Sequence, residues 1–310
     1  MAPTLSRVPL GVAIPQAFPD GPPGPRRIRE YLGRAEALGF ESAWVIEQIL
    51  GGIPSLEPLA LLTWAAAVTE RLRLGSAVLL TALRSPVHLA KSLATLDHLS
   101  EGRLSVGVGL GANTPLYPAF GVAVERRAER FAEGIRLMKR LWTEPRVTFD
   151  GRFWRLADAR MEPKPVQRPH PPIWFGAHQP QALRRAVELG QGFIGAGSAS
   201  TAAFLEEVRV LRGLLAEAGR DPAQFGVGKR VYIAVDADRR RAERRLADWF
   251  GAFYGRRELA EQVAVRGEPA ECVDRLRELV EGGARFLMLH PVFDELEQLE
   301  RLAAEVAPKL

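Results

Sequence analysis

Short apolar runs alternate with longer amphipathic stretches along most of the chain. Residues 74–80 form an apolar run, and a second run at 104–110 ends in glycines. Between them, Ser85 and Pro86 suit the start of a helix, as N-cap and first-turn residues. Strands buried on both faces of a parallel sheet are apolar throughout. The stretch 72–111 therefore predicts a strand, a helix and a second strand parallel to the first.

The same alternation continues before and after this stretch. Each connection between apolar runs is long enough for a helix that returns the chain to a parallel strand. Eight such units predict a (β/α)8 TIM barrel that takes up residues 1–310 as one domain. The expected strands are 8–14, 42–46, 74–80, 104–110, 173–175, 192–196, 228–235 and 286–289, and the expected helices include 26–38, 58–69, 124–142, 180–189, 201–218, 270–281, 295–306 and an arginine-rich helix capped by Asp236.

The alternation breaks between residues 143 and 172. The segment VTFDGRFWRL alternates with a period of two around Asp150 and Gly151, the pattern of a β-hairpin. The segment EPKPVQRPHPP that follows is too rich in proline for a helix or an inner strand. Because a plain connection needs only a few residues, residues 143–172 predict an insertion after the fourth helix.

Composition changes this picture little. The chain has 310 residues, of which 47% are hydrophobic, and a formal net charge of +5. Acidic residues are interspersed with the basic ones and no nucleic-acid-binding motif is present, so no nucleic-acid partner is expected. No apolar run approaches the ~20 residues that span a bilayer, and the first ten residues lack the apolar segment of a signal peptide. We expect a cytoplasmic protein without a membrane partner.

The thiol and imidazole groups do not have the spacing of a metal site. The single cysteine, Cys272, lies among Val273, Leu276 and Leu279 on a helical pattern, which favours a packed thiol over a nucleophile. The five histidines show no metal-ligand spacing. We expect no bound metal.

The active site of such a barrel lies on the loops that follow the strands. Three of these loops are rich in glycine, which allows a ligand to approach the backbone closely. The segment GAGSAS at 195–200 precedes a helix and offers N–H groups and hydroxyls to an anion. This favours a phosphate-bearing cofactor, although glycine in a short loop also serves simply to turn the chain.

Four segments, read in order, resemble the bacterial luciferase-like monooxygenase superfamily, and within it most of all the oxidoreductases that depend on the deazaflavin coenzyme F420. Together they extend the resemblance over almost the whole chain, from Gly11 to about Leu289. It implies a barrel of the bacterial luciferase-like type, with a flavin or deazaflavin across its C-terminal mouth, and a homodimer formed through the early helices. The segments are GFESAWVIEQ, LRLGSAVLLTALRSPVHLAKSLATLDHLSEGRLSVGVGLG, AFGVAVERRAERFAEGIRLMKRLW and PHPPIWFGAHQPQALRRAVELGQGFIGAG.

The resemblance also implies which residues contact the cofactor. A cis non-prolyl peptide behind the ring falls at Ala77-Val78, and Glu47 falls at the acidic position beside the ring system. Contacts from the fourth strand and from the loops that hold a phosphate-bearing tail or a substrate phosphate fall at Gly109, Gly111, Asn113, Gly176, Ala177, Gln179, Gly195, Gly197 and Ser198.

Two positions depart from the family pattern. Family members commonly carry histidine where this chain has Gln48, and the sugar-phosphate dehydrogenases carry a glutamate base where it has Ala112. Glutamine does not titrate and alanine accepts no proton, so alcohol oxidation that uses these two groups is disfavoured. Reduction of an activated double bond, or monooxygenation, requires fewer catalytic groups from the protein because the cofactor supplies the chemistry.

The candidates for a catalytic role are Gln48, His178 and His290. His178 could instead contact the cofactor or cap the helix that follows it, and His290 could form a structural hydrogen bond to its own loop. Arg84 could pair with an anionic tail, but it is expected to be a solvated loop arginine. Tyr117 either covers the ring as a lid or packs within its loop.

The leading hypothesis is an oxidoreductase that uses reduced F420 for hydride transfer to or from a small organic substrate. One alternative is an FMN-dependent luciferase-like monooxygenase that works with a separate flavin reductase. Another is a non-catalytic flavin-binding paralogue.

Overall fold

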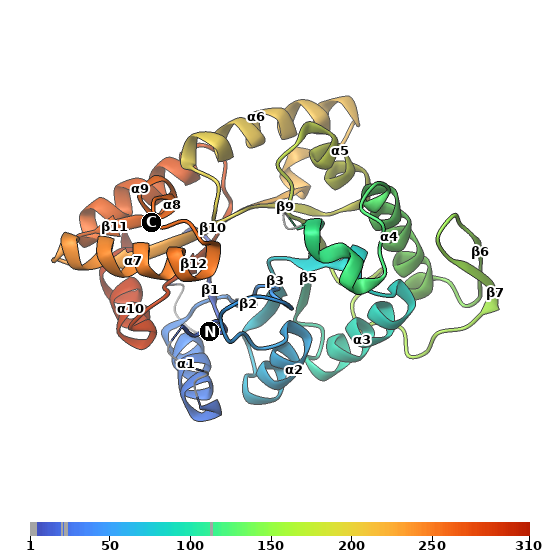
Figure 1. The fold of residues 1–310 in the computed structure, drawn as a ribbon, viewed down its shortest axis with the longest axis horizontal. Helices are drawn as coiled ribbons and strands as arrows, with labels where there is room; N and C mark the ends of the chain where they lie inside the picture. Colours follow the sequence, from blue (N-terminus) through green and yellow to red (C-terminus); the bar gives the residue numbers. More distant parts are fainter. Residues whose placement is uncertain (1–4, 20, 22–23, 112–113) are drawn as a thin grey trace.

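The computed structural model describes residues 5–19, 21, 24–111 and 114–310, and in this part of the chain eight parallel strands close into a barrel (Figure 1). Neighbouring strands pair in chain order, and pairing of β12 with β1 and of β10 with β9 completes the ring. The predicted TIM barrel is confirmed. Its strands are β1 (Leu10–Ala13), β2 (Ser42–Val45), β3 (Arg73–Ser76), β5 (Leu104–Gly109), β8 (Ile173–Phe175), β9 (Gly192–Gly195), β10 (Gly226–Val235) and β12 (Phe286–His290).

Helices surround the barrel on its outside (Figure 1). Ser85 begins α3 as predicted, since its hydroxyl accepts a hydrogen bond from the His88 N–H. The helices are α1 (Pro25–Leu38), α2 (Pro58–Val68), α3 (Pro86–Leu99), α4 (Arg127–Thr143), α5 (Pro180–Leu189), α6 (Thr201–Glu217), α7 (Arg239–Tyr254), α8 (Leu259–Val263), α9 (Pro269–Glu281) and α10 (Glu295–Arg301).

The region after β10 differs from the prediction in two ways. The N-cap of α7 is Asp238, whose carboxylate accepts from the Arg241 N–H at 3.0 Å, and not Asp236. Asp236 instead forms an ion pair with the Arg241 guanidinium at 2.8 Å. The short helix α8 and the strand β11 (Val265–Gly267), which pairs with the last residues of β10, were not predicted.

The insertion forms the expected hairpin, from β6 (Val147–Asp150) and β7 (Arg155–Ala159), which projects from the side of the barrel (Figure 1). Glu133 of α4 holds it in place. Its carboxylate accepts from three successive backbone N–H groups, those of Arg152, Phe153 and Trp154, at 2.9–3.1 Å. The hairpin is therefore attached to the outer layer, away from the strand ends.

Aromatic side chains fill the inside of the barrel. Trp44 from β2 lies 5.2 Å from Phe286 of β12 and 6.4 Å from Trp174 of β8, measured between ring centroids. Trp44 is buried in the interior cluster and the partly buried Trp174 packs against it, in agreement with their predicted packing role. The barrel is consequently a packed core and not a channel, which leaves ligands only the loops at the ends of the strands.

Candidate cofactor and substrate site

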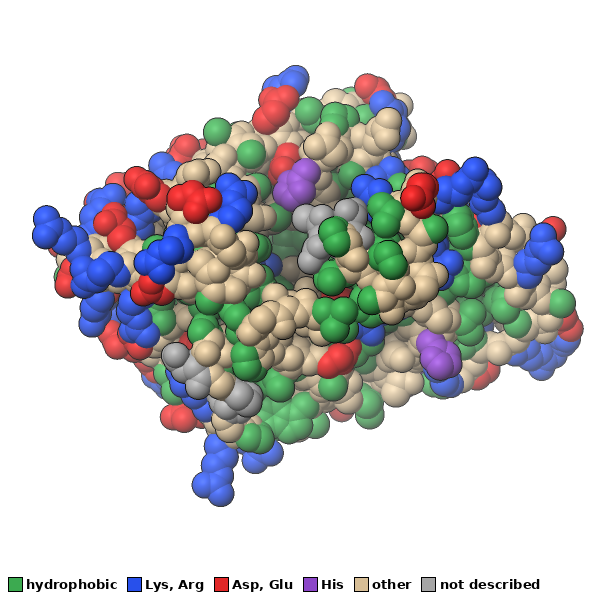
Figure 2. Space-filling model, in the orientation of Figure 1, with side chains coloured by type: hydrophobic (Ala, Val, Ile, Leu, Met, Phe, Trp, Pro, Cys, Tyr) green, Lys and Arg blue, Asp and Glu red, His purple; other side chains and the backbone are tan. Residues whose placement is uncertain are grey.

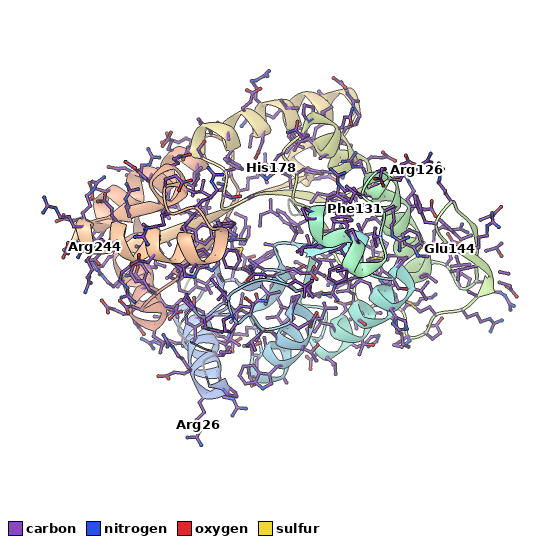
Figure 3. All side chains as sticks on the ribbon, in the orientation of Figure 1. Arg26, Arg126, Phe131, Glu144, His178 and Arg244 are labelled. Atoms are coloured by element: carbon purple, nitrogen blue, oxygen red, sulfur yellow. The ribbon has the colours of Figure 1, made fainter. Side chains whose placement is uncertain are left out.

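The carboxyl ends of the strands meet on the face shown in Figure 2, which is hollowed near its centre. The loops that contain the predicted site residues surround this opening, and His178 lies at its rim (Figure 3). The short helical segment Thr114–Phe120, after β5, lies over the front of the barrel (Figure 1). Most of the predicted positions are thus brought to one mouth.

The third strand contains a bulge where it reaches the mouth. Gly75 pairs with Ser105, but Leu79, the first residue of β4 (Leu79–Leu80), pairs with Val108, so this strand has one residue more than its partner. The Ser76 hydroxyl bridges the gap, donating to the Gly107 carbonyl at 2.9 Å and accepting from the Gly107 N–H at 3.0 Å. The Ala77-Val78 peptide is cis, as the resemblance implied.

The bulge directs Val78 toward the neighbouring strand ends. A Cβ atom on Gly109 would lie 2.6 Å from one Val78 methyl carbon, Cγ2, and a Cβ atom on Gly176 would lie 3.1 Å from the other, Cγ1. Val78 therefore excludes a side chain at position 109 and leaves little room for one at position 176, whatever else these glycines contact. Val78 is half-buried, so it gives the mouth an apolar surface. The predicted contact Asn113, together with Ala112, lies outside the described residues.

Glu47 supports the segment that follows the bulge. Its side chain is 1% exposed, and its carboxylate accepts from the Leu80 N–H and from Nε of Arg84 at 3.1 Å. Arg84 also contacts Glu57, the N-cap residue of α2, at 2.9 Å. Burial alone would lower the pKa of Arg84, but the two carboxylates raise it. The expectation of a solvated Arg84 is wrong because these partners, distant in sequence, enclose it.

Gln48 lies in the loop after β2 and accepts a hydrogen bond from the Ser55 hydroxyl at 3.0 Å. The loop is fixed from the other side by Gln16, which was not predicted. The Gln16 amide donates to the carbonyls of Ile46 and Leu56, at 2.8 and 2.6 Å, and accepts from the Ile46 N–H at 2.8 Å. A polar residue shortly after a buried strand was the available signal. Gln16 thus fixes the backbone at Ile46, directly before Glu47 and Gln48.

His178 is paired with a buried carboxylate. Its Nδ1 lies 2.7 Å from Oε1 of Glu207, on α6, while 51% of the His178 side chain is exposed. The other oxygen, Oε2 of Glu207, is buried without a hydrogen-bonding partner among the described residues. When Nδ1 donates to the carboxylate, Nε2 is the nitrogen left for a ligand. Glu207 was missed because its helix spacing marks it only as a surface residue.

Lys229 holds the loop that contains Gly195, Gly197 and Ser198. Its ammonium donates to the carbonyls of Ala196 and Ala199, the latter at 2.8 Å. The residue is 3% exposed, and this burial lowers the pKa of Lys229 to about 7 although Glu207 acts to raise it. Two adjacent basic residues within the apolar run 226–235 were the signal in the sequence for this buried charge.

His290 ends β12 as predicted and is 7% exposed. Its ring stacks on Tyr232, with centroids 4.8 Å apart. Burial, and then the charge of Arg230, lower the pKa of His290 well below its ordinary value. The imidazole is neutral at pH 7, so His290 has no proton of suitable acidity to give as a general acid.

Tyr117 is a packing residue and not a lid. It is 1% exposed, and its hydroxyl donates to the Leu110 carbonyl at 2.5 Å. Burial raises the pKa of its hydroxyl. The interpretation of Tyr117 as a cover for the ring is therefore wrong.

Cys272 is fully buried as predicted, and burial raises the pKa of its thiol to about 12. Within the described part of the chain, histidine, cysteine, aspartate and glutamate side chains form no group of three or more that suits a metal ion. Among the same residues, every helix is too short or too polar to cross a bilayer.

Comparison with solved structures supports the fold. An F420-dependent secondary alcohol dehydrogenase, solved with an F420-acetone adduct, superposes with a TM-score of 0.84 at 20% identity and covers 96% of this chain and 98% of its own. A monooxygenase from Streptomyces bottropensis gives a TM-score of 0.83 at 24% identity, with the same coverage. At these identities the likeness concerns the barrel architecture alone.

Sequence comparison identifies relatives and a family. The F420-dependent glucose-6-phosphate dehydrogenase of Kineococcus radiotolerans is 30% identical over 92% of this chain and 93% of its own length. An uncharacterised protein of Mycobacterium tuberculosis is 40% identical over 54% of this chain and 58% of its own. Residues 8–261 match the family described as luciferase-like monooxygenase. The chain belongs to the luciferase-like monooxygenase family.

Proposed function

We propose that this protein is an F420-dependent oxidoreductase that transfers hydride to or from a small organic substrate at the barrel mouth. The observation that carries the proposal is the 30% identity to an F420-dependent dehydrogenase over 92% of the chain. The family assignment is compatible with it, and the site residues described above supply the surfaces that a deazaflavin requires.

The residues at the mouth fit such a cofactor. Val78 offers an apolar surface to a flat ring, and Glu47 fixes the neighbouring Leu80 backbone. The loops 176–179 and 195–198 offer backbone N–H groups and His178 to an anionic tail, with the buried basic side chains of Lys229 and Arg230 behind them. When bound, the deazaflavin supplies the hydride chemistry. The protein binds and orients both molecules and excludes water from between them.

The substrate of the sugar-phosphate dehydrogenases is not part of the proposal. Gln48 does not titrate and is hydrogen-bonded to Ser55, and the residue after Gly111 is alanine. Neither position provides the acid or base that alcohol oxidation needs. Reduction of an activated double bond is the reaction class that these residues suit better.

Titration of the purified protein with F420, FMN and FAD tests the function. We expect F420 to bind with a dissociation constant in the low micromolar range or below, and the two flavins to bind more weakly. Fluorescence of the deazaflavin and absorbance of the flavins provide the readings. Tight FMN binding without affinity for F420 would contradict the proposal and favour the monooxygenase that works with a separate flavin reductase.

His178→Gln is expected to weaken F420 binding by roughly 10-fold or more, the effect of losing a hydrogen bond to a charged group. Glu207→Gln, which keeps an acceptor for Nδ1 but removes the charge, is expected to have a smaller effect in the same direction. The matched control is His88→Gln, on the exposed surface of α3. Equal F420 affinities of all three variants and the unaltered protein would remove His178 from the cofactor site.

The homodimer through the early helices and, for the FMN alternative, the separate reductase remain proposals that rest on the family resemblance. A flavin-binding paralogue without catalysis is excluded by any turnover of a panel of conjugated carbonyl compounds with reduced F420.

A further inference from the structure

Arg230 points into the barrel at the mouth. Its partner in the sheet register is Met288, a member of the interior cluster. Gly228, two residues earlier, faces the same cluster, since a Cβ atom there would lie 2.9 Å from the Phe286 ring. Side chains two residues apart on a strand share a face. Tyr232 and Ala234 follow on the same face but pack against α7. Arg230 is therefore the last inward residue of β10 before the part that α7 covers.

The hydrogen bonds of this guanidinium are incomplete. One nitrogen, Nη2, donates to the hydroxyl of Tyr232 and to that of Tyr254, the latter at 3.2 Å. The two hydroxyls lie 2.8 Å apart. Nε is buried, and among the described residues neither Nε nor Nη1 has an acceptor. A buried charged donor without an acceptor is costly, so an acceptor from outside the chain is favoured.

The charge of Arg230 is also uncompensated. It is 8% exposed and forms no ion pair with a carboxylate in the described part of the chain. Burial raises the pKa of Tyr254, so its hydroxyl stays neutral at pH 7 and supplies no negative charge. The neighbouring Lys229 supplies no negative charge either, and the acidic group Glu207 acts on Lys229. Arg230 remains protonated under these conditions.

Two further features place this group at the ligand opening. The loop after β9 crosses directly beside it, since a Cβ atom on Gly197 would lie 3.0 Å from Nε of Arg230. His290, next to Tyr232 in the register and stacked on it, has a buried Nδ1 without a partner among the described residues. Arg230, Tyr232, Tyr254 and His290 together form what we call the β10–β12 cluster.

We propose that the β10–β12 cluster binds an oxyanion carried by the substrate, so that the substrates of this protein are small organic carboxylates or phosphates. Arg230 provides the charge and the open donors, and the two tyrosines fix the guanidinium. This inference rests on the proposed function for the hydride step, but the anion site itself is independent of it. The cofactor also carries anionic groups, and the experiment below separates the two sources.

Calorimetric titration with crotonate, and with its neutral isostere crotonamide, tests the site with and without saturating F420. We expect the unaltered protein to bind crotonate and inorganic phosphate at millimolar concentrations, and crotonamide more weakly. Arg230→Met is expected to weaken crotonate binding by roughly 10- to 100-fold and leave crotonamide unchanged. Arg244→Met, on the exposed face of α7 (Figure 3), is the matched control.

The stability of the ligand-free variants gives a second reading. Arg230→Met is expected to raise the midpoint of thermal unfolding, because a long apolar side chain replaces an unpaired buried charge. An arginine retained only for structure would lower that midpoint on replacement. Equal binding of crotonate and crotonamide by the unaltered protein, or unchanged crotonate binding by Arg230→Met, would overturn the proposal.

Titration with F420, and with the deazaflavin riboside that lacks the phosphate and glutamate groups, assigns the anion. If Arg230→Met weakens F420 but not the riboside, the anion belongs to the cofactor and the substrate assignment is wrong. If the unaltered protein binds neither deazaflavin but retains its preference for crotonate, the proposed function fails while the anion site stands.

Discussion

Replacing Glu47 with leucine is expected to lower the free energy of unfolding by about 3–5 kcal/mol, the usual effect of removing one partner of a buried ion pair. The change leaves the Leu80 N–H without an acceptor and takes from Arg84 its buried carboxylate. Leu80 lies two residues after Val78, so we expect the position of Val78 to change as well. Affinity for F420 is expected to fall together with stability.

Urea denaturation followed by circular dichroism measures the Glu47 effect. Glu47→Gln keeps an acceptor for both partners, so a smaller loss is expected from it. Glu300→Gln removes an exposed carboxylate that pairs with Arg34 and is expected to leave the denaturation midpoint within error. A Glu47→Leu protein as stable as the unaltered one would show that the carboxylate does not hold this segment.

The second large effect concerns Lys229 and the pH dependence of stability. With the pKa of Lys229 lowered from 10.5 to about 7, the native state releases a proton that the unfolded state keeps up to pH 10.5. The unfolded state binds more protons between these values, so this group makes stability rise with pH there. The slope approaches about 1.4 kcal/mol per pH unit. Below pH 7 both states are protonated and the contribution is constant.

Lys229→Met is expected to lack this rise. Its stability relative to the unaltered protein should therefore decline steadily from pH 7 to pH 10, measured as unfolding free energies at intervals of pH. Lys309→Met, at an exposed position near the C-terminus, should show no such trend. Parallel pH profiles for Lys229→Met and the unaltered protein would mean that Lys229 keeps its proton in the folded state.

The barrel was predictable because its strands are buried on both faces, and runs such as 104–110 show this burial directly in the sequence. The hairpin at 147–159 was predictable because its turn residues and alternation are local. Asp236 and Asp238 both suit an N-cap, and the choice depends on the Arg241 guanidinium, which engages Asp236. Local pattern gives no means of separating them.

The site was only partly predictable, for a related reason. The loops at the mouth follow from the barrel itself, and the position of the bulge came from the family resemblance. The pairing of Arg84 with Glu47, and of His178 with Glu207, joins residues far apart in the sequence. Buried charge on Lys229 and Arg230 contradicts the ordinary preference of such residues for the surface. Tertiary contacts alone determine these partners.

The aromatic side chains that fill the barrel have a consequence for the order of events in a catalytic cycle. Trp44, Trp174 and Phe286 close the interior below the mouth, so the two reactants share one opening. If a deazaflavin binds against Val78, a substrate that binds later lies on its solvent side. We therefore expect the cofactor to bind before the substrate and to leave after the product.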